Sequence, residues 1–132
     1  MDVVFGGIYL YEPPAVASAS DQSALLITSG SEQAGRRPYI IVSRDIVNKN
    51  KPTAVGVPMS TKTQKANSYR ILLPVAEIVR EIGETYDFQN SVALCDHVRV
   101  IDLEQLKRKI GRLSDTAIAS VGLGLSFVFD LR

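Results

Sequence analysis

The sequence predicts a small domain that is mainly β, folded as a partly closed antiparallel barrel with helices at one end. Most apolar residues fall in short runs of strand length, bounded by glycine, proline and polar residues. Helical patterns come only late in the chain, so strands and helices do not alternate as in parallel βαβ folds. The 132 residues fit one domain spanning 1–132, and the hydrophobic fraction of 45% is ordinary for a soluble globular protein.

The first half of the chain is expected to consist of strands and loops. Residues 8–11 predict a first strand, which the following Pro13 stops because proline cannot donate to a sheet. An extended loop follows at about 12–30, in which residues 24–28 form a short strand or pack onto the body. The continuous apolar run 39–42 predicts a buried strand. The later expectations are a helical turn at 45–49, a strand at 53–57 closed by Pro58, a loop at 60–68, a strand at 69–73 and one or two helical turns at 75–82.

The last third is expected to hold the longest strand and two helices. Residues 91–101 alternate, which places Asp96 on the face of the valines and Cys95, His97 and Arg99 on the opposite face. A short helix is expected to follow, with Asp102 as its cap, Gly111 as its end and a stripe of Leu103, Leu106 and Ile110. The last helix is expected after Ser114, with a stripe of Ile118, Val121 and Leu125, and with Gly122 and Gly124 placed for close packing against a neighbour.

Charge is unevenly distributed along the chain, although the formal net charge is only +1. No Lys or Arg precedes Arg36, and no Asp or Glu occurs in residues 46–76. That second stretch carries Lys49, Lys51, Lys62, Lys65 and Arg70. A local basic face of this kind is able to steer a polyanion, and a solvated lysine-rich loop is an equally good interpretation of charge alone.

Composition also limits the compartment and the cofactors. The single cysteine, Cys95, excludes an internal disulfide and fits a reducing compartment, and no cleavable leader opens the chain, so we expect a cytoplasmic protein. The apolar stretch 118–129 is too short for a bilayer, which needs roughly 20 residues, so no membrane partner is expected. No Cys, His and Asp cluster has ligand spacing, so no metal or other cofactor is expected.

Residues 30–38 read Gly-Ser-Glu-Gln-Ala-Gly-Arg-Arg-Pro. This segment resembles the G-S-E-Q-x-G-x-R-P signature of the MazF/PemK toxins, and the segments 91–96 and 109–114 resemble later blocks of that family. The resemblance covers the chain from the first strand to the last helix. It implies an SH3-like barrel of the CcdB/PemK type, a homodimer, and endoribonuclease activity on single-stranded RNA such as mRNA. It also implies a MazE-like antitoxin partner that occupies the RNA groove.

The resemblance implies a site centred on Arg37 and Ser60. RNA cleavage without a metal uses the ribose 2′-hydroxyl as the attacking group, and the charge on the phosphorus must be stabilised. The planar guanidinium of Arg37 suits two phosphate oxygens, and the alternative is a structural arginine paired with Glu32. Ser60 takes the place of the family's catalytic threonine and is otherwise a turn residue. Asp96 is either a third catalytic residue or a satisfied structural acid.

Further residues are expected to bind RNA around this centre. They are Glu32, Gln33, Thr61, Lys62, Lys65, His97 and Arg99. The single histidine excludes a mechanism that uses a pair of histidines. Two other functions remain open, namely a non-catalytic toxin that binds DNA gyrase as CcdB does, and a degenerate relative that binds RNA without cutting it. The basic stretch and the Arg37 motif favour the nuclease.

Overall fold

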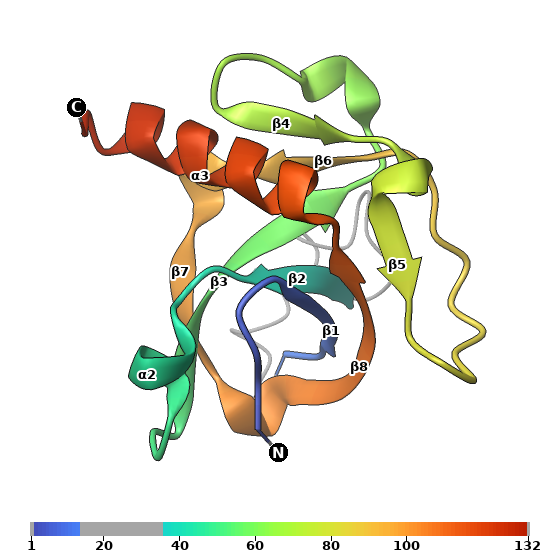
Figure 1. Cartoon of the computed structure of the whole chain (residues 1–132), viewed down its shortest axis with the longest axis vertical. Coiled ribbons are helices and arrows are strands. Elements are labelled where there is room, and N and C mark those ends of the chain that lie inside the picture. Colours follow the sequence, from blue (N-terminus) through green and yellow to red (C-terminus); the bar gives the residue numbers. More distant parts are fainter. Residues whose placement is uncertain (1, 14–35, 132) are drawn as a thin grey trace, which may run out of the picture.

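The strands of the computed structural model join into one curled antiparallel sheet with a C-terminal helix lying against it (Figure 1). The structure describes residues 2–13 and 36–131. Most of the expected loop at 12–30, including the strand or packed segment at 24–28, lies outside these residues. The sheet order is β4-β6-β3-β2-β1-β8-β5, and β7 pairs with β3. The partly closed antiparallel barrel predicted from the sequence is therefore confirmed.

The elements follow the chain in simple order. The strands are β1 (Gly7–Tyr11), β2 (Arg37–Ile41), β3 (Thr53–Ser60), β4 (Arg70–Leu73), β5 (Ile78–Arg80), β6 (Ser91–Leu94), β7 (Arg99–Asp102) and β8 (Leu106–Leu113). The α-helices are α2 (Asp45–Asn48) and α3 (Asp115–Val128). Single 3-10 turns are η2 (Thr63–Lys65), η3 (Val75–Glu77), η4 (Cys95–His97) and η5 (Leu103–Gln105).

The sheet is buried on both faces near its centre, because alternate residues of the same strand enter two different clusters. In β1, Ile8 and Leu10 join a cluster that packs beneath α3, while Tyr9 and Tyr11 face the inside of the curl. Every residue of β1 is buried. A continuous apolar strand in the middle of the sheet therefore separates the core under the helix from the cluster inside the curl, which also contains Tyr39.

The last helix begins as the sequence predicts. The Ser114 side chain accepts a hydrogen bond from the Ala117 N–H at 3.1 Å and so caps the first turn. Val121 is fully buried, and Gly124 packs so closely that an added Cβ would lie 2.8 Å from the Cys95 sulfur. The predicted close packing thus holds for Gly124, whereas Gly122 faces open space.

Three expectations about the strands are wrong. Pro58 does not close β3, which continues to Ser60. The pairing of β3 with β7 ends at Gly56 and its pairing with β6 begins at Met59, so Pro58 lies in the gap between these two partners. The missing N–H of proline is tolerated at such a gap because no ladder bond to either partner is required there.

Residues 91–101 do not form one strand. The chain turns at η4 between β6 and β7, so Asp96 and His97 lie on a turn and not on opposite strand faces. Both strands pair with β3, and the turn shifts the chain from one part of β3 to the other. Alternation alone does not distinguish one long strand from two short strands joined in this way.

The helix expected from Asp102 to Gly111 is also wrong, because β8 occupies most of that range. Two register shifts against β1 disturb the alternation in β8. As a result Leu106 joins the cluster inside the curl while Ile110 joins the cluster beneath α3. Bulges of this kind add a residue to one strand, which makes an apolar pattern of period two resemble a helical one. The helical turns expected at 75–82 reduce to η3, after which the chain forms β5.

Candidate functional site

The sheet brings Arg37 and Ser60 to the same end of the neighbouring strands β2 and β3. Tyr39 of β2 pairs with Pro58 of β3, and two residues further toward the outer end of each strand lie Arg37 and Ser60. Paired residues of an antiparallel sheet have side chains on one face, and this relation repeats every two residues. Arg37 itself pairs with Tyr11 of β1. Tyr11, Arg37 and Ser60 therefore lie at the same end of the three adjacent strands β1, β2 and β3.

Arg99 lies on the same face of the sheet as Tyr11 and Tyr39, although it is distant from both in sequence. It pairs with Gly56, and its guanidinium carbon lies 4.9 Å from the ring centre of Tyr11 and 5.5 Å from that of Tyr39. A cation over an aromatic face is attracted to the ring electrons. Gly56 permits this arrangement, because a Cβ there would come within 3.1 Å of the Tyr39 ring.

Two positive charges act on the Tyr39 hydroxyl. Burial raises the pKa of this hydroxyl, and the charges of Arg99 and Arg37, together with a hydrogen bond with Arg99, oppose that rise. Both arginines are therefore close enough to Tyr39 to act on its charge. The neighbouring Arg36 is differently placed, since its Nη2 lies 2.8 Å from a carboxylate oxygen of Glu12. Arg37 and Arg99 form a face suited to an anion with several oxygens, such as a phosphate.

Ser60 lies in a small hollow at the end of β3. Only 3% of the residue is exposed, and its Oγ accepts a hydrogen bond from the Lys62 N–H at 3.2 Å. This contact occupies the oxygen and leaves the hydroxyl hydrogen for another acceptor. The hollow, of about 40 Å³, is lined by Pro38, Met59, Ser60, Thr61, Tyr86, Asp87, Phe88, Gln89 and Ser91. Pro38 adjoins Arg37 in β2, so the hollow lies next to the Arg37 end of that strand.

Asp96 lies apart from Ser60 and is held by Arg70. The Arg70 guanidinium donates to both carboxylate oxygens, from Nε at 3.0 Å and from Nη2 at 2.7 Å. These hydrogen bonds are the main reason why the pKa of Asp96 is lowered. Ser60 pairs with Val92, whereas Asp96 follows the end of β6 beside the start of β4. His97 accompanies Asp96, with its Nε2 3.7 Å from the nearer carboxylate oxygen.

The remaining predicted site residues fall into two groups. Thr61, Lys62 and Lys65 follow Ser60 directly, and Thr61 is exposed while both lysines are partly exposed. They therefore surround the Arg37–Ser60 end of the sheet. Glu32 and Gln33, as well as the alternative pairing of Glu32 with Arg37, lie outside the described residues.

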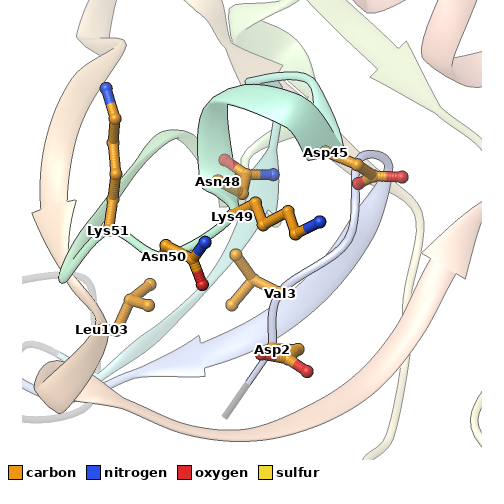
Figure 2. Close-up of a pocket in the computed structure, with 8 residues that line it drawn as sticks. All are labelled: Asp2, Val3, Asp45, Asn48, Lys49, Asn50, Lys51 and Leu103. Carbon is orange, nitrogen blue, oxygen red and sulfur yellow. The ribbon is translucent and has the colours of Figure 1, made fainter.

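A larger hollow, of about 440 Å³, lies at the other end of β2 and β3 (Figure 2). Its wall comes from α2 and the loop after it, from the N-terminal segment and from Leu103, and the Lys51 side chain extends away from the other labelled residues (Figure 2). Two polar side chains of this hollow make hydrogen bonds within the protein. Asp45 accepts from the Phe5 N–H at 2.8 Å, and Asn48 donates to the Ser43 carbonyl at 2.9 Å. The hydrogen bond of Asp45 holds the N-terminal segment against α2. The hollow is remote from Arg37 and Ser60.

Sequence reasoning missed three parts of this region. It assigned no role to Tyr11 and Tyr39 as platforms for Arg99, none to Arg70 as the partner of Asp96, and none to residues 84–91 opposite Ser60. The apolar runs around Tyr11 and Tyr39 do indicate that both tyrosines lie in strands. Their contact with Arg99 is not predictable in this way, because it depends on the register between strands.

Among residues 2–13 and 36–131, no three His, Cys, Asp or Glu side chains gather as a metal site would require. The helices of this part of the chain are all too short or too polar to cross a membrane.

The fold and the site define a small curled-sheet protein with an arginine-rich face beside a recessed hydroxyl. Residues 23–129 match the model of the PemK-like, MazF-like toxins of type II toxin–antitoxin systems. The chain is 36% identical over 103 residues to endoribonuclease EndoA of Bacillus subtilis, covering 77% of this chain and 83% of that protein. It is 32% identical over 103 residues to endoribonuclease MazF of Staphylococcus saprophyticus, covering 78% and 81%.

A solved structure supports the same fold. It is an endoribonuclease in complex with its cognate antitoxin from a mycobacterial species, and it superposes with a TM-score of 0.67 at 14% identity, covering 98% of this chain and 97% of that one. At this identity the likeness concerns the fold alone. Together with the family match, these relatives show that the chain belongs to the PemK-like, MazF-like toxin family of type II toxin–antitoxin systems.

Proposed function

We propose that this protein is a toxin endoribonuclease that cuts single-stranded RNA, such as mRNA, without a metal ion. The observation that carries the proposal is that Arg37 and Ser60 lie at the same end of the neighbouring strands β2 and β3, with Pro38 lining the hollow that holds Ser60. Family membership and the names of two relatives, which are endoribonucleases, support it. In this reaction the 2′-oxygen attacks the neighbouring phosphorus, and the bond from phosphorus to the 5′-oxygen breaks. The products are a cyclic phosphate and a free 5′-hydroxyl. The 2′-hydroxyl loses one proton and the leaving 5′-oxygen gains one, so the step requires no oxidant, reductant or cofactor.

The two arginines stabilise the charge that develops on the phosphate. Arg37 lies in the same strand as Tyr39 and Arg99 lies in β7, and the positive charges of both act on the Tyr39 hydroxyl. Fixed cations of this kind do the electrostatic work that a metal ion does elsewhere. The Ser60 hydroxyl donates to a phosphate oxygen from its place beside Arg37.

Asp96 acts on this site indirectly. Both of its carboxylate oxygens accept from Arg70, and the resulting lowered pKa keeps it ionised, which makes it a poor proton donor near neutral pH. We assign it as a positioning residue that holds Arg70 and His97 at the edge of the RNA surface. Lys62 and Lys65 contact the RNA backbone beyond Ser60, where a mobile polyanion meets positive charge without a fixed sequence requirement, and Thr61 adds only a weak contact to the same backbone.

The proposed partners are a MazE-like antitoxin and a second copy of the chain. An antitoxin bound over Arg37 and Ser60 would prevent access of RNA to the same arginines. A homodimer is supported by the exposed apolar residues of α3, since Leu123 and Phe127 remain 73% and 60% exposed in the single chain. Light scattering at micromolar concentration is expected to give twice the mass of the chain, and a monomer would contradict this part of the proposal.

The proposal is tested by incubating the purified protein with unstructured RNA in the presence of a chelator. Wild type should cleave and leave a cyclic phosphate, and Arg37→Ala should lose roughly 10²–10³ in rate, as is typical when one charge-stabilising donor is removed. Arg112→Ala is the matched control, because Arg112 is exposed on β8 at the opposite end of β1. Activity that disappears with the chelator and returns with a divalent ion would contradict the metal-free mechanism.

A further inference from the structure

The segment between β5 and β6 forms the wall opposite Ser60. Tyr86, Asp87, Phe88 and Gln89 line the same small hollow as the Ser60 hydroxyl. Within this wall Asp87 and Gln89 are exposed, whereas Phe88 is 8% exposed and belongs to the core beneath α3. Two polar side chains are thus presented to solvent beside Ser60, on either side of a buried aromatic anchor.

The beginning of this segment is fixed by Glu84. Arg108 of β8 donates to both of its carboxylate oxygens, at 2.8 and 3.1 Å, and the N–H groups of Thr85 and Tyr86 donate to one of the same oxygens at 3.0 and 2.9 Å. The Glu84 side chain is only 8% exposed. The hydrogen bonds from Arg108 are the main cause that lowers the pKa of Glu84 to about 2. A single carboxylate therefore fastens the loop both to the sheet and to its own backbone.

The rest of the segment is held by further contacts. Arg80 donates to the Tyr86 carbonyl, and its guanidinium carbon lies 5.5 Å from the ring centre of Phe88. The rings of Tyr86 and Phe88 pack edge to face at 5.0 Å. Ser91 donates to the Gln89 carbonyl at 2.8 Å. A loop fixed at so many points is already ordered before a ligand arrives, so binding costs little additional conformational entropy.

We propose that Asp87 and Gln89 select the base next to the scissile phosphate, an inference that rests on the proposed function. The hollow of about 40 Å³ is too small for a base, so the base would lie across its mouth with its edge toward these two side chains. An ionised carboxylate only accepts hydrogen bonds. Asp87 therefore favours adenine, cytosine and guanine, which present exocyclic amino donors, over uracil, whose one edge donor, the N3–H, lies between two carbonyl oxygens that a carboxylate repels.

The test measures kcat/KM on four RNA oligonucleotides that differ only in the base beside the cut, for wild type, Asp87→Asn, Gln89→Ala and a control. Asp102→Asn is the control, because Asp102 is an exposed aspartate of β7 that pairs with Thr53, at the other end of β3 from Ser60. We expect wild type to disfavour uracil and Asp87→Asn to improve the relative use of uracil by about tenfold, in line with the worth of one good base contact. Gln89→Ala should flatten the preference, and Asp102→Asn should leave it unchanged.

A second variant separates a role in recognition from a role in folding. Arg108→Gln frees Glu84 without touching Asp87 or Gln89, and it should broaden the base preference while circular dichroism stays that of the wild type. Identical base profiles for wild type, Asp87→Asn and Gln89→Ala would overturn the inference. If wild type cuts none of the four RNAs, the proposed function fails, and the same variants are compared by binding titrations. An unchanged base preference in binding then overturns this inference as well.

Discussion

Arg70 and Asp96 form a two-point ion pair between β4 and η4, with contacts of 3.0 and 2.7 Å, although 26 residues separate them in the chain. The pair fixes the turn that interrupts residues 91–101, since Asp96 lies in that turn. Both side chains are about a quarter exposed, at 24% and 27%. Each carboxylate oxygen accepts a hydrogen bond from Arg70, and this favours the structural interpretation of Asp96 over the catalytic one.

The two interpretations of Asp96 predict different mutational patterns. If Asp96 only positions Arg70, Asp96→Asn and Arg70→Gln should reduce single-turnover cleavage by similar modest factors, each far smaller than the loss in Arg37→Ala. The double variant should be no worse than either single one, because both remove the same contact. A severe loss in Asp96→Asn beside a nearly active Arg70→Gln would make Asp96 catalytic.

The hydroxyl of Ser60 is expected to be essential and that of its neighbour dispensable. Ser60→Ala should lower single-turnover cleavage strongly, while Ser60→Thr should retain activity, because threonine keeps the hydroxyl. Thr61→Ala serves as the matched control, since Thr61 follows Ser60 but is exposed outside the strand. The opposite result, with damage confined to Thr61→Ala, would move the hydroxyl role by one residue. If neither change matters, Arg37 must work with other groups.

The two glycines of α3 should respond in opposite directions to the same substitution. Gly122→Ala adds a methyl group in open space and improves helix propensity, so it should raise the free energy of unfolding by up to about 1 kcal/mol. Gly124→Ala places a Cβ 2.8 Å from the Cys95 sulfur and 2.9 Å from the Ile71 side chain. Overpacking of this kind costs about 1–3 kcal/mol. Urea denaturation of both variants is the measurement, and a stabilised Gly124→Ala would contradict the described packing of α3 on β4.

The contribution of Glu84 to stability should depend on pH. Its pKa is about 2 in the folded protein and about 4.5 in the unfolded chain. A lowered folded-state pKa means that the contribution is complete above about pH 4.5 and is lost as the pH falls toward 2. The difference in unfolding free energy between wild type and Glu84→Gln, measured by urea denaturation, should be constant from pH 7 to pH 5 and shrink below pH 4.5. Glu104→Gln, at an exposed glutamate of η5, should show no such trend. A difference that persists unchanged down to pH 3 would argue against the ion pair with Arg108.

The sequence by itself determined the family and the strand-rich architecture, and it indicated Arg37 and Ser60 as the centre of the proposed site. These features depend on local information: the motif at 30–38, the β-prone runs at 8–11 and 39–42, and the capping position of Ser114. A short apolar run forms a strand wherever a neighbour is present, and a serine cap acts on its own first turn. Such features can therefore be predicted without knowing which strands are neighbours in the sheet.

Only the tertiary structure decided which distant residues meet. The two bulges in the pairing of β1 with β8 convert a helix-like apolar pattern into a strand, and the turn at η4 moves Asp96 away from Ser60 toward Arg70. The approach of Arg99 to Tyr11 and Tyr39 depends on the register of β3 with β7 and on the space left by Gly56. Register is set by hydrogen bonds between strands that are far apart in sequence. It therefore cannot be predicted from local sequence patterns and is fixed only when the strands pair in the folded sheet.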